Sequence, residues 1–321
     1  MRFKFFDKNT TDFPKNRHLD TKNICIFAND SYTTFLKHTF AMKRTILFLL
    51  TLALVAACNR SETQYRAIAD TLNTAEPLEL SRITKAHDMI IDASNLTDEQ
   101  TTHLQELFVK YIFACADVQT SLMEEAYGAA LTANDPQLME QQLDSLNRAM
   151  SNLRQYGIVM YTSEGGINTD IMPMFIAEAF WKYMTPLERT IATLSELEVE
   201  TPSLNDAAIN ISYEEVAQRL KMCDDMLAQY PDDPLTPQIT ACQKYYLAIL
   251  LAGDDNSPVF DWQTNTLMPQ VQQIIELYIA EYPDAVSTPT LQQFMALAAA
   301  SNFKKSADID TFIEQHILEQ N

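Results

Sequence analysis

The amino-acid sequence predicts an all-α protein built from helical hairpins. The chain of 321 residues has five glycines, too few for a protein rich in tight turns or in glycine-rich phosphate loops. Leu, Ala, Gln, Glu and Met are abundant, and all of them favour helices. Apolar residues also recur at intervals of three and four over long segments, which is the spacing of one buried helix face.

The N-terminal region contains an apolar run, residues 45–57, that follows Lys43 and Arg44. The run is shorter than the roughly 20 residues that a membrane-spanning helix needs. A basic pair, a short apolar core and small residues are the three parts of a secretory signal. Met42 stands directly before the basic pair, so we expect residues 42–57 to be a signal peptide. Residues 1–41 are then a non-native upstream extension or, alternatively, a cytoplasmic leader.

The end of the apolar run, Val-Ala-Ala-Cys at residues 55–58, resembles the lipobox of bacterial lipoproteins. The resemblance implies cleavage before Cys58 and attachment of acyl chains such as palmitate through the Cys58 thiol. It also implies a location in the bacterial cell envelope, at the outer membrane, on the periplasmic face or at the cell surface. The alternatives are a plain signal peptide with an incidental cysteine and an uncleaved anchor helix.

The charge of the remaining chain limits its partners. Residues 1–57 hold 9 of the 23 basic and 4 of the 43 acidic residues, which leaves 14 basic and 39 acidic residues and a net charge of −25 in residues 58–321. This balance argues against binding nucleic acid or anionic lipid headgroups, both of which need clustered Lys and Arg. We therefore expect membrane attachment through acyl chains alone. The acidic surface is either a solvated secreted surface or the surface for a cationic partner.

The first half of the chain is predicted to contain a tether and a helical domain. Residues 58–77 are polar, which predicts a tether, and residues 78–200 are predicted to form an N-terminal helical domain. Thr97–Gln100 and Thr185–Glu188 have the pattern of a capping box, and each is expected to begin a helix. Asp135 and Pro136 are expected to begin the second of two long helices that form an antiparallel hairpin.

One irregular stretch, residues 157–173, interrupts the helical pattern. Its Gly-Gly pair marks a turn, which predicts a small β-hairpin near residues 158–170 or a loop that closes over the helices. Tyr161, Ser163 and Glu164 concentrate polar groups there and form a candidate functional loop, with Glu164 as an acid or base. The alternative is a plain connecting loop.

The C-terminal part contains an internal repeat. Tyr-Pro-Asp at residues 230–232 recurs at 282–284, and Thr-Pro at 236–237 recurs at 288–289, each at an offset of 52. The proline after Tyr ends one helix, and the threonine is expected to cap the next. Residues 201–321 are therefore predicted to be a helical-repeat domain of two hairpins and a capping helix. The domain boundary is expected in the polar segment before this repeat, which is residues 198–212.

The first repeat unit, residues 213–250, resembles a tetratricopeptide-type hairpin. It is most similar to the hairpins of the outer-membrane barrel-assembly lipoproteins, which also end their first helix on Tyr-Pro before an acidic turn and place alanine in the second, here Ala241. The resemblance covers residues 212–318 and implies a groove for a protein partner. The insertion at residues 252–265 departs from the usual period of about 34 residues. Because no partner-contact residue matches, no barrel-assembly role is carried over.

Three cysteines are expected to be buried. Cys115 lies on the apolar stripe of the first long helix. Cys223 and Cys242 lie on opposite arms of the first repeat hairpin, and the equivalent positions of the second unit hold Ile275 and Phe294. Both cysteines therefore face the core, either as a disulfide or as two packed thiols.

Sequence motifs for catalysis or metal binding are lacking. The chain has no HExxH, GxSxG, GxxxxGK[ST] or CxxC motif, and His87, His103 and His316 lack metal-type spacing. We expect no metal, no cofactor and no enzymatic activity. The sequence favours a membrane-anchored helical scaffold that binds another protein. The alternatives are a lipoprotein that captures a peptide or glycan and an enzyme that uses the loop at residues 161–166.

Overall fold

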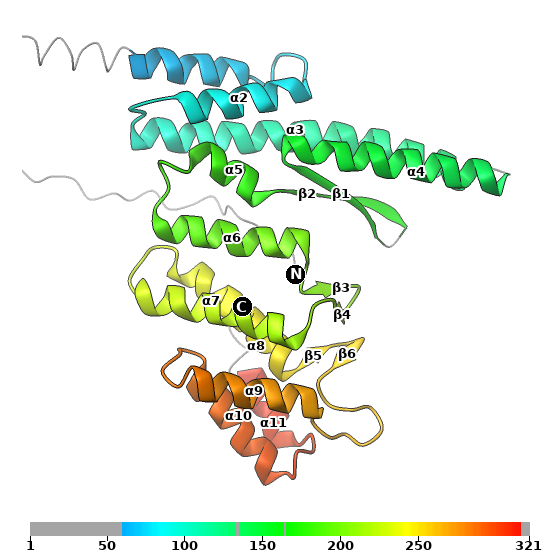
Figure 1. Cartoon of the computed structure of the whole chain (residues 1–321), viewed down its shortest axis with the longest axis vertical. Helices are drawn as coiled ribbons and strands as arrows, with labels where there is room; N and C mark the ends of the chain where they lie inside the picture. The colour runs from blue at the N-terminus through cyan, green and yellow to red at the C-terminus, as the bar shows by residue number, and fades with distance from the viewer. Residues whose placement is uncertain (1–59, 133–134, 164, 316–321) are drawn as a thin grey trace, which may run out of the picture. The chain divides into compact units, whose positions relative to one another are not determined.

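The computed structural model describes residues 60–132, 135–163 and 165–315. The described chain is mostly helical, with a few short two-stranded sheets, which confirms the predicted all-α fold (Figure 1). The described residues belong to one compact unit. Cys58 and the predicted signal peptide lie outside the described residues. None of the helices in the described ranges is both long and apolar enough to cross a membrane.

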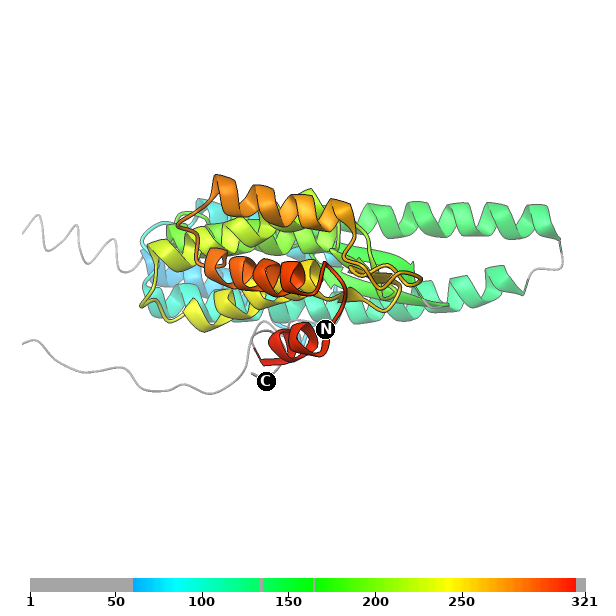
Figure 2. The same cartoon turned by 90° about the horizontal axis from the view of Figure 1, so that it is seen from below.

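The first half of the described chain has its own apolar core, and we call residues 60–184 the N-terminal module. Its helices are residues 60–71, α2 (Leu80–Asp92), α3 (Asp98–Leu131), α4 (Pro136–Asn152), the 3-10 turn η1 (Leu153–Tyr156) and α5 (Pro173–Phe180). Ile90, Phe108 and Phe180 are among its fully buried side chains. As predicted, α3 and α4 form an antiparallel hairpin, and their distal parts run side by side beyond α2 (Figures 1 and 2).

The segment expected to be a tether is instead part of this core. Residues 60–71 are helical, and the side chains of Ile68 and Leu72 are at most 1 % exposed. Arg82 of α2 holds the end of this helix by donating from Nε to the Thr71 carbonyl at 2.7 Å. The prediction of a tether was wrong because a few well-spaced apolar residues are sufficient to pack a helix when the opposite face is solvated.

Three predicted helix starts are confirmed by their capping bonds. Thr97 and Gln100 bond to each other's backbone N–H groups, and Thr185 and Glu188 do the same, so both capping boxes are complete. Asp135 accepts from the Gln137 backbone N–H at 2.9 Å at the start of α4. Each cap satisfies an N–H group that has no partner within its own helix, which fixes where the helix begins.

The irregular stretch forms the predicted β-hairpin. Strands β1 (Ile158–Ser163) and β2 (Gly166–Ile171) pair antiparallel, with Ile158 opposite Ile171 and Met160 opposite Thr169. Thr169 of β2 is joined to Thr120 of α3 by a hydroxyl–hydroxyl hydrogen bond of 2.7 Å. The hairpin is therefore fixed against the α3–α4 pair and does not close over it.

The second half has a separate apolar core, and we call residues 185–315 the C-terminal module. Its elements are α6 (Pro186–Glu200), β3 (Leu204–Asn205), β4 (Ala208–Ile209), α7 (Tyr213–Gln229), α8 (Thr236–Leu251), β5 (Gly253–Asp254), β6 (Ser257–Pro258), α9 (Pro269–Glu281), α10 (Thr288–Ala300) and α11 (Ala307–Ile313). Two of the short hairpins are joined, because Asn256 donates its backbone N–H to the Ala207 carbonyl at 2.8 Å. In Figure 1, β3–β4 and β5–β6 gather at one end of the helices.

The repeat predicted from the sequence is visible in the element boundaries. Helices α7 and α9 end at residues 229 and 281, and α8 and α10 begin at residues 236 and 288, so both pairs keep the offset of 52. The two units differ most between α8 and α9, where β5, β6 and the loop after them occupy the predicted insertion.

The repeated threonines do not cap their helices as expected. The N-caps of α8 and α10 are Leu235 and Ser287, and neither makes a side-chain capping bond. Thr236 instead donates its hydroxyl to the Tyr230 carbonyl at 2.8 Å, and Thr288 donates to the Tyr282 carbonyl at 2.6 Å. Each threonine therefore satisfies a carbonyl left open at the end of the preceding helix. Unlike Thr185, neither is followed three residues later by Glu or Gln to complete a capping box.

The segment expected to be a domain boundary is tightly packed. Helix α6 contributes Leu187 and Leu194 to the C-terminal core, so the change of core occurs near Thr185 and not at residue 200. Ser203 is fully buried and donates its hydroxyl to Glu198 Oε1 at 2.6 Å. Residues 198–212 therefore do not act as a linker, since their polar side chains bond to neighbours within the module.

Candidate functional site

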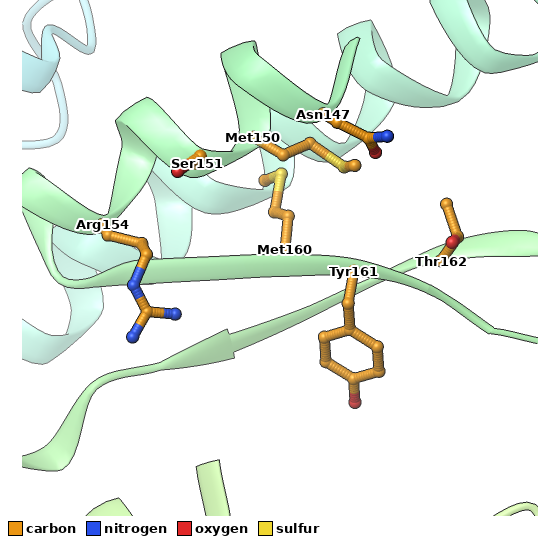
Figure 3. A pocket seen from close by; sticks show the side chains of 7 residues that line it. All are labelled: Asn147, Met150, Ser151, Arg154, Met160, Tyr161 and Thr162. Carbon is orange, nitrogen blue, oxygen red and sulfur yellow. The ribbon is translucent and has the colours of Figure 1, made fainter. Parts of the chain in front are cut away.

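An open groove runs between α4 and strand β1, next to the predicted functional loop. It encloses about 350 Å³ and is lined by Asn147, Met150, Ser151, Arg154, Met160, Tyr161 and Thr162. In Figure 3 the Met150 and Met160 side chains point toward one another, whereas Tyr161 points away from α4. Two methionines therefore form an apolar floor, and the polar groups Asn147 and Ser151 lie along the α4 side.

Gly157 sets the direction in which β1 leaves the helices. It follows η1 with φ +73°, a left-handed conformation that favours glycine. A Cβ atom at this position would lie 2.4 Å from Cδ1 of Phe175, so a larger residue would also displace the Phe175 ring. The Gly157 carbonyl accepts the Met172 backbone N–H at 2.9 Å, which joins the two ends of the hairpin. The turn at one end of the groove therefore favours glycine for two reasons, its left-handed backbone and the close approach of the Phe175 ring.

The predicted loop residues occupy different positions in this hairpin. Tyr161 lies on β1, and its hydroxyl donates to Asp170 Oδ2 on β2 at 3.0 Å. Ser163 is the last residue of β1. Glu164 lies outside the described residues, so the proposed acid–base role is a prediction that the structure does not address. Of the three residues, Tyr161 lines the groove.

A cluster of charges lies where η1 approaches α6. Arg154 of the groove forms an ion pair with Glu200. The neighbouring Glu196 accepts the Met174 backbone N–H at 2.9 Å, and partial burial raises the pKa of its carboxyl, with Glu200 adding to the rise. The positive charge of Arg154 opposes this rise in the Glu196 pKa and partly offsets the negative charge of the cluster. It orders one end of the groove and brings α6 close to the hairpin.

A second depression continues the groove along α4. It encloses about 440 Å³ and is lined by Asp144, Asn147, Arg148 and Ser151, two of which are shared with the first. Arg148 donates from Nε to the Asp144 backbone carbonyl at 3.3 Å. Sequence reasoning did not select these α4 residues. The available signal was the presence of Arg148 and Arg154 close together in a chain with 14 basic and 39 acidic residues after position 57.

The cysteines of the first repeat hairpin are free thiols. Cys223 lies on α7 and is fully buried, and Cys242 lies on α8 and is partly buried. Burial raises the pKa of both thiols, that of Cys242 to about 11, and the neighbouring Cys242 adds to the rise at Cys223. Thiols that stay protonated are poor nucleophiles, so neither side chain is suited to covalent chemistry.

Two buried charged residues in the C-terminal module serve its architecture. Arg219 of α7 is fully buried and pairs with Glu198 at 2.6 Å and with Glu215 at 3.1 Å. Asp224, also on α7, accepts from Gln243, Tyr278 and Ser287, the last through both backbone and hydroxyl. These bonds connect α6, α7, α8 and α9 and the start of α10. Such closed networks suit a structural role, because their donors and acceptors are already matched.

Within the described ranges, no group of three or more His, Cys, Asp or Glu side chains is arranged to hold a metal ion. No protein-family model, curated protein or solved structure matches the chain. The candidate site therefore depends on its own geometry: a polar groove with a methionine floor, beside a strand that is exposed at Tyr161 and Thr162.

Proposed function

We propose that the protein is a lipid-anchored adaptor of the bacterial cell envelope that binds another protein through the α3–α4 hairpin. The observation that carries the proposal is the distal part of this hairpin, residues 117–148, which we call the arm. Figure 2 shows the ends of α3 and α4 extending past the other described elements. Part of the arm packs on the β1–β2 hairpin, as the Thr120–Thr169 bond shows, but the arm also carries large apolar side chains that are exposed.

The exposure of these side chains is high. Leu122, Leu131 and Leu138 are 52 %, 52 % and 47 % exposed. Single exposed apolar residues are ordinary, but three leucines on one projecting helical pair present apolar surface away from both cores. A helical partner that covers the arm would remove this surface from water. The arm therefore supports a binding function of the adaptor type.

The charge of the arm indicates the chemistry of the partner. Residues 117–148 contain six acidic residues and one basic residue, Arg148. The acidic residues of the arm and its exposed leucines fit a basic, amphipathic segment of the partner, since both charge and apolar contacts are then complementary, whereas Arg148 is the one basic position of the arm. We expect binding to weaken as ionic strength rises, because exposed charges are screened by salt.

The proposed anchor residue is close in sequence to the first described helix. The helix that packs through Ile68 and Leu72 is described from Arg60 onward, and Arg60 follows Cys58 by two residues in the sequence. An acyl chain on Cys58 would therefore hold the folded unit near the bilayer surface rather than at the end of a long tether. We expect Cys58→Ala to abolish labelling with a palmitate analogue and to release the protein from membranes. Labelling that persists would show that the anchor is elsewhere.

The arm can be tested separately from the anchor. Leu131→Ser with Leu138→Ser removes apolar surface from the arm without touching either core. Leu277→Ser with Val286→Ser is the matched control, because these residues are 45 % exposed in the C-terminal module. Cross-linking in cells followed by capture and mass spectrometry should lose its principal protein partner in the arm variant and retain it in the control. Equal capture by both variants would remove the arm from the proposal.

The peptide-binding alternative also has an observation in its favour. The groove between α4 and β1 is open, polar along one side and apolar at its floor, and β1 is exposed beside it at Tyr161 and Thr162. These features fit an extended peptide better than a compact small molecule.

A further inference from the structure

Strand β1 has an open edge. Within the described part of the chain its strand partner is β2, and the pairing between them is continuous from Ile158 to Ser163. The segment contains no lysine or proline, and its unbroken register has no bulge, so it lacks the usual features that prevent an edge from pairing with another chain. A six-residue strand of this kind is a template for a further strand.

The register shows which backbone groups face outward. The Gly157 carbonyl accepts the Met172 N–H, so the pair next to Ile158 and Ile171 is of the hydrogen-bonded type. Hydrogen-bonded pairs alternate along an antiparallel ladder. Residues 158, 160 and 162 therefore direct their N–H and C=O groups away from β2. Two of them, Met160 and Thr162, line the groove, where Thr162 is exposed and Met160 is largely buried.

We propose that the outer edge of β1 and the α4 groove bind an extended peptide segment of a partner protein, which adds to the hairpin as a third strand. Backbone bonds to Met160 and Thr162 would supply the pairing. Alternate side chains of the added strand would lie against the floor formed by Met150 and Met160. Methionine side chains adapt to different apolar partners, which suits a site that recognises its ligand mainly through backbone hydrogen bonds.

The charged residues of the groove select among peptides. Arg148, Arg154 and Asp144 are the charged residues that line the two depressions. Arg154 shares its charge with Glu200. Arg148 has no ion pair among the described side chains, and it therefore carries the preference for an acidic residue in the added strand.

The test uses the full chain after residue 57 and a fluorescent peptide, acetyl-Val-Glu-Val-Glu-Val-amide, whose residues alternate and favour strands. Thr162→Pro removes an outward N–H without removing a bond to β2, whereas Thr162→Val keeps the backbone intact. Fluorescence polarisation should show binding that Thr162→Pro weakens by about tenfold or more and that Thr162→Val leaves within about twofold. N-methylation of every second peptide amide should abolish binding when the methylated amides are those that donate to β1.

The charge preference has its own comparison. A peptide with lysine in place of glutamate should bind less tightly to the wild-type protein, and Arg148→Glu should reverse the order of the two peptides. No binding of the glutamate peptide up to about 1 mM, or equal binding by Thr162→Pro, would overturn the proposal. A dimer in sedimentation analysis that Thr162→Pro converts to monomer would assign the edge to a second copy of this chain and would also overturn it.

This inference deepens the proposed adaptor function and rests on it, but the two fail differently. Partner capture that requires Leu131 and Leu138 but is unaffected by Thr162→Pro, with no peptide binding, would leave the adaptor function standing and end the strand-addition proposal. Peptide binding that depends on Thr162, together with partner capture that is unchanged by the Leu131 and Leu138 substitutions, would support strand addition and end the proposal that the arm binds the partner.

Discussion

The N-terminal and C-terminal modules are both helical, but they are held together in different ways. The N-terminal core is built from apolar packing, and two of its buried polar atoms, His87 Nε2 and Thr101 Oγ1, have no hydrogen-bond partner among the described residues. The C-terminal core contains Arg219 and Asp224, which are buried and bonded on several sides. The N-terminal module is therefore stabilised mainly by apolar packing, whereas the C-terminal module is also stabilised by a few buried polar bonds.

This difference has a physical reason in the topology. Helices of the N-terminal module pack through buried apolar side chains such as Ile90, Phe108 and Phe180. The C-terminal module repeats a short hairpin, and Asp224 of the first unit bonds to Tyr278 and Ser287 of the second. A buried carboxylate with fixed donors specifies one register between the units, whereas apolar faces alone tolerate sliding.

The largest expected effect comes from removing this connection. Asp224→Ala leaves buried donors of Gln243, Tyr278 and Ser287 without their acceptor, so we expect a loss of about 3–5 kcal/mol in the free energy of unfolding of the C-terminal module. Urea denaturation measures the loss, and hydrogen exchange should locate it in α7–α10 rather than in α3.

The neighbouring residue supplies the matched control for this variant. Asp225 is exposed on the same helix, where it pairs with Lys221. Asp225→Ala should change stability by less than about 1 kcal/mol. A similar loss from both substitutions would mean that helix α7, and not the buried carboxylate, was disturbed.

A smaller effect is expected at the repeated threonines. Thr236→Ala and Thr288→Ala each remove one hydroxyl bond to a tyrosine carbonyl, so each should cost about 1 kcal/mol. Equal losses in the two variants, measured by urea denaturation, would confirm that the two units use the same bond. A loss in one variant alone would show that the two units share the sequence pattern but that the threonine bond contributes to stability in only one of them.

The N-terminal module should tolerate loss of a buried polar atom. His87 stacks on Phe175 with 4.5 Å between ring centres, and its Nε2 atom is buried without a partner. His87→Phe keeps a ring in this position and removes the unsatisfied atom, so stability should be unchanged or higher by up to about 1 kcal/mol. A thermal melt in which this variant unfolds well below the wild type would show that the imidazole has a structural bond after all.

The smallest predicted effect is a pH-dependent change in stability at Glu196, where α6 meets the N-terminal module. Burial raises the pKa of Glu196 above its unfolded value, so ionised Glu196 costs stability at neutral pH. The cost fades as the pH falls through that raised pKa and is gone below the unfolded pKa, because both states then hold the proton. Glu196→Gln should therefore raise Tm at pH 7, by an amount on the order of 1 °C, and should not raise it near pH 3.

The matched variant here is Glu200→Gln, which removes the ion pair with Arg154. It should not raise Tm at pH 7. A rise in both variants would indicate general relief of negative charge in this acidic chain rather than relief of a buried carboxylate.

Sequence patterns determined much of this protein. The scarcity of glycine and the helical spacing of apolar residues predicted the all-α fold, and Thr97–Gln100 and Thr185–Glu188 predicted helix starts that the structure confirms. The offset of 52 predicted the repeat, and the Gly-Gly pair predicted the β1–β2 hairpin. These features are local or periodic, so neighbouring residues are sufficient to specify them.

Tertiary structure alone decided how these elements are connected. The sequence does not show that Ile68 finds a core, that Arg219 meets Glu198 or that Thr236 turns from capping its own helix to satisfying Tyr230. It also does not place Arg148 and Arg154 beside the open edge of β1. Such contacts join residues that are distant in the chain, and their energies depend on burial and geometry that no local pattern encodes.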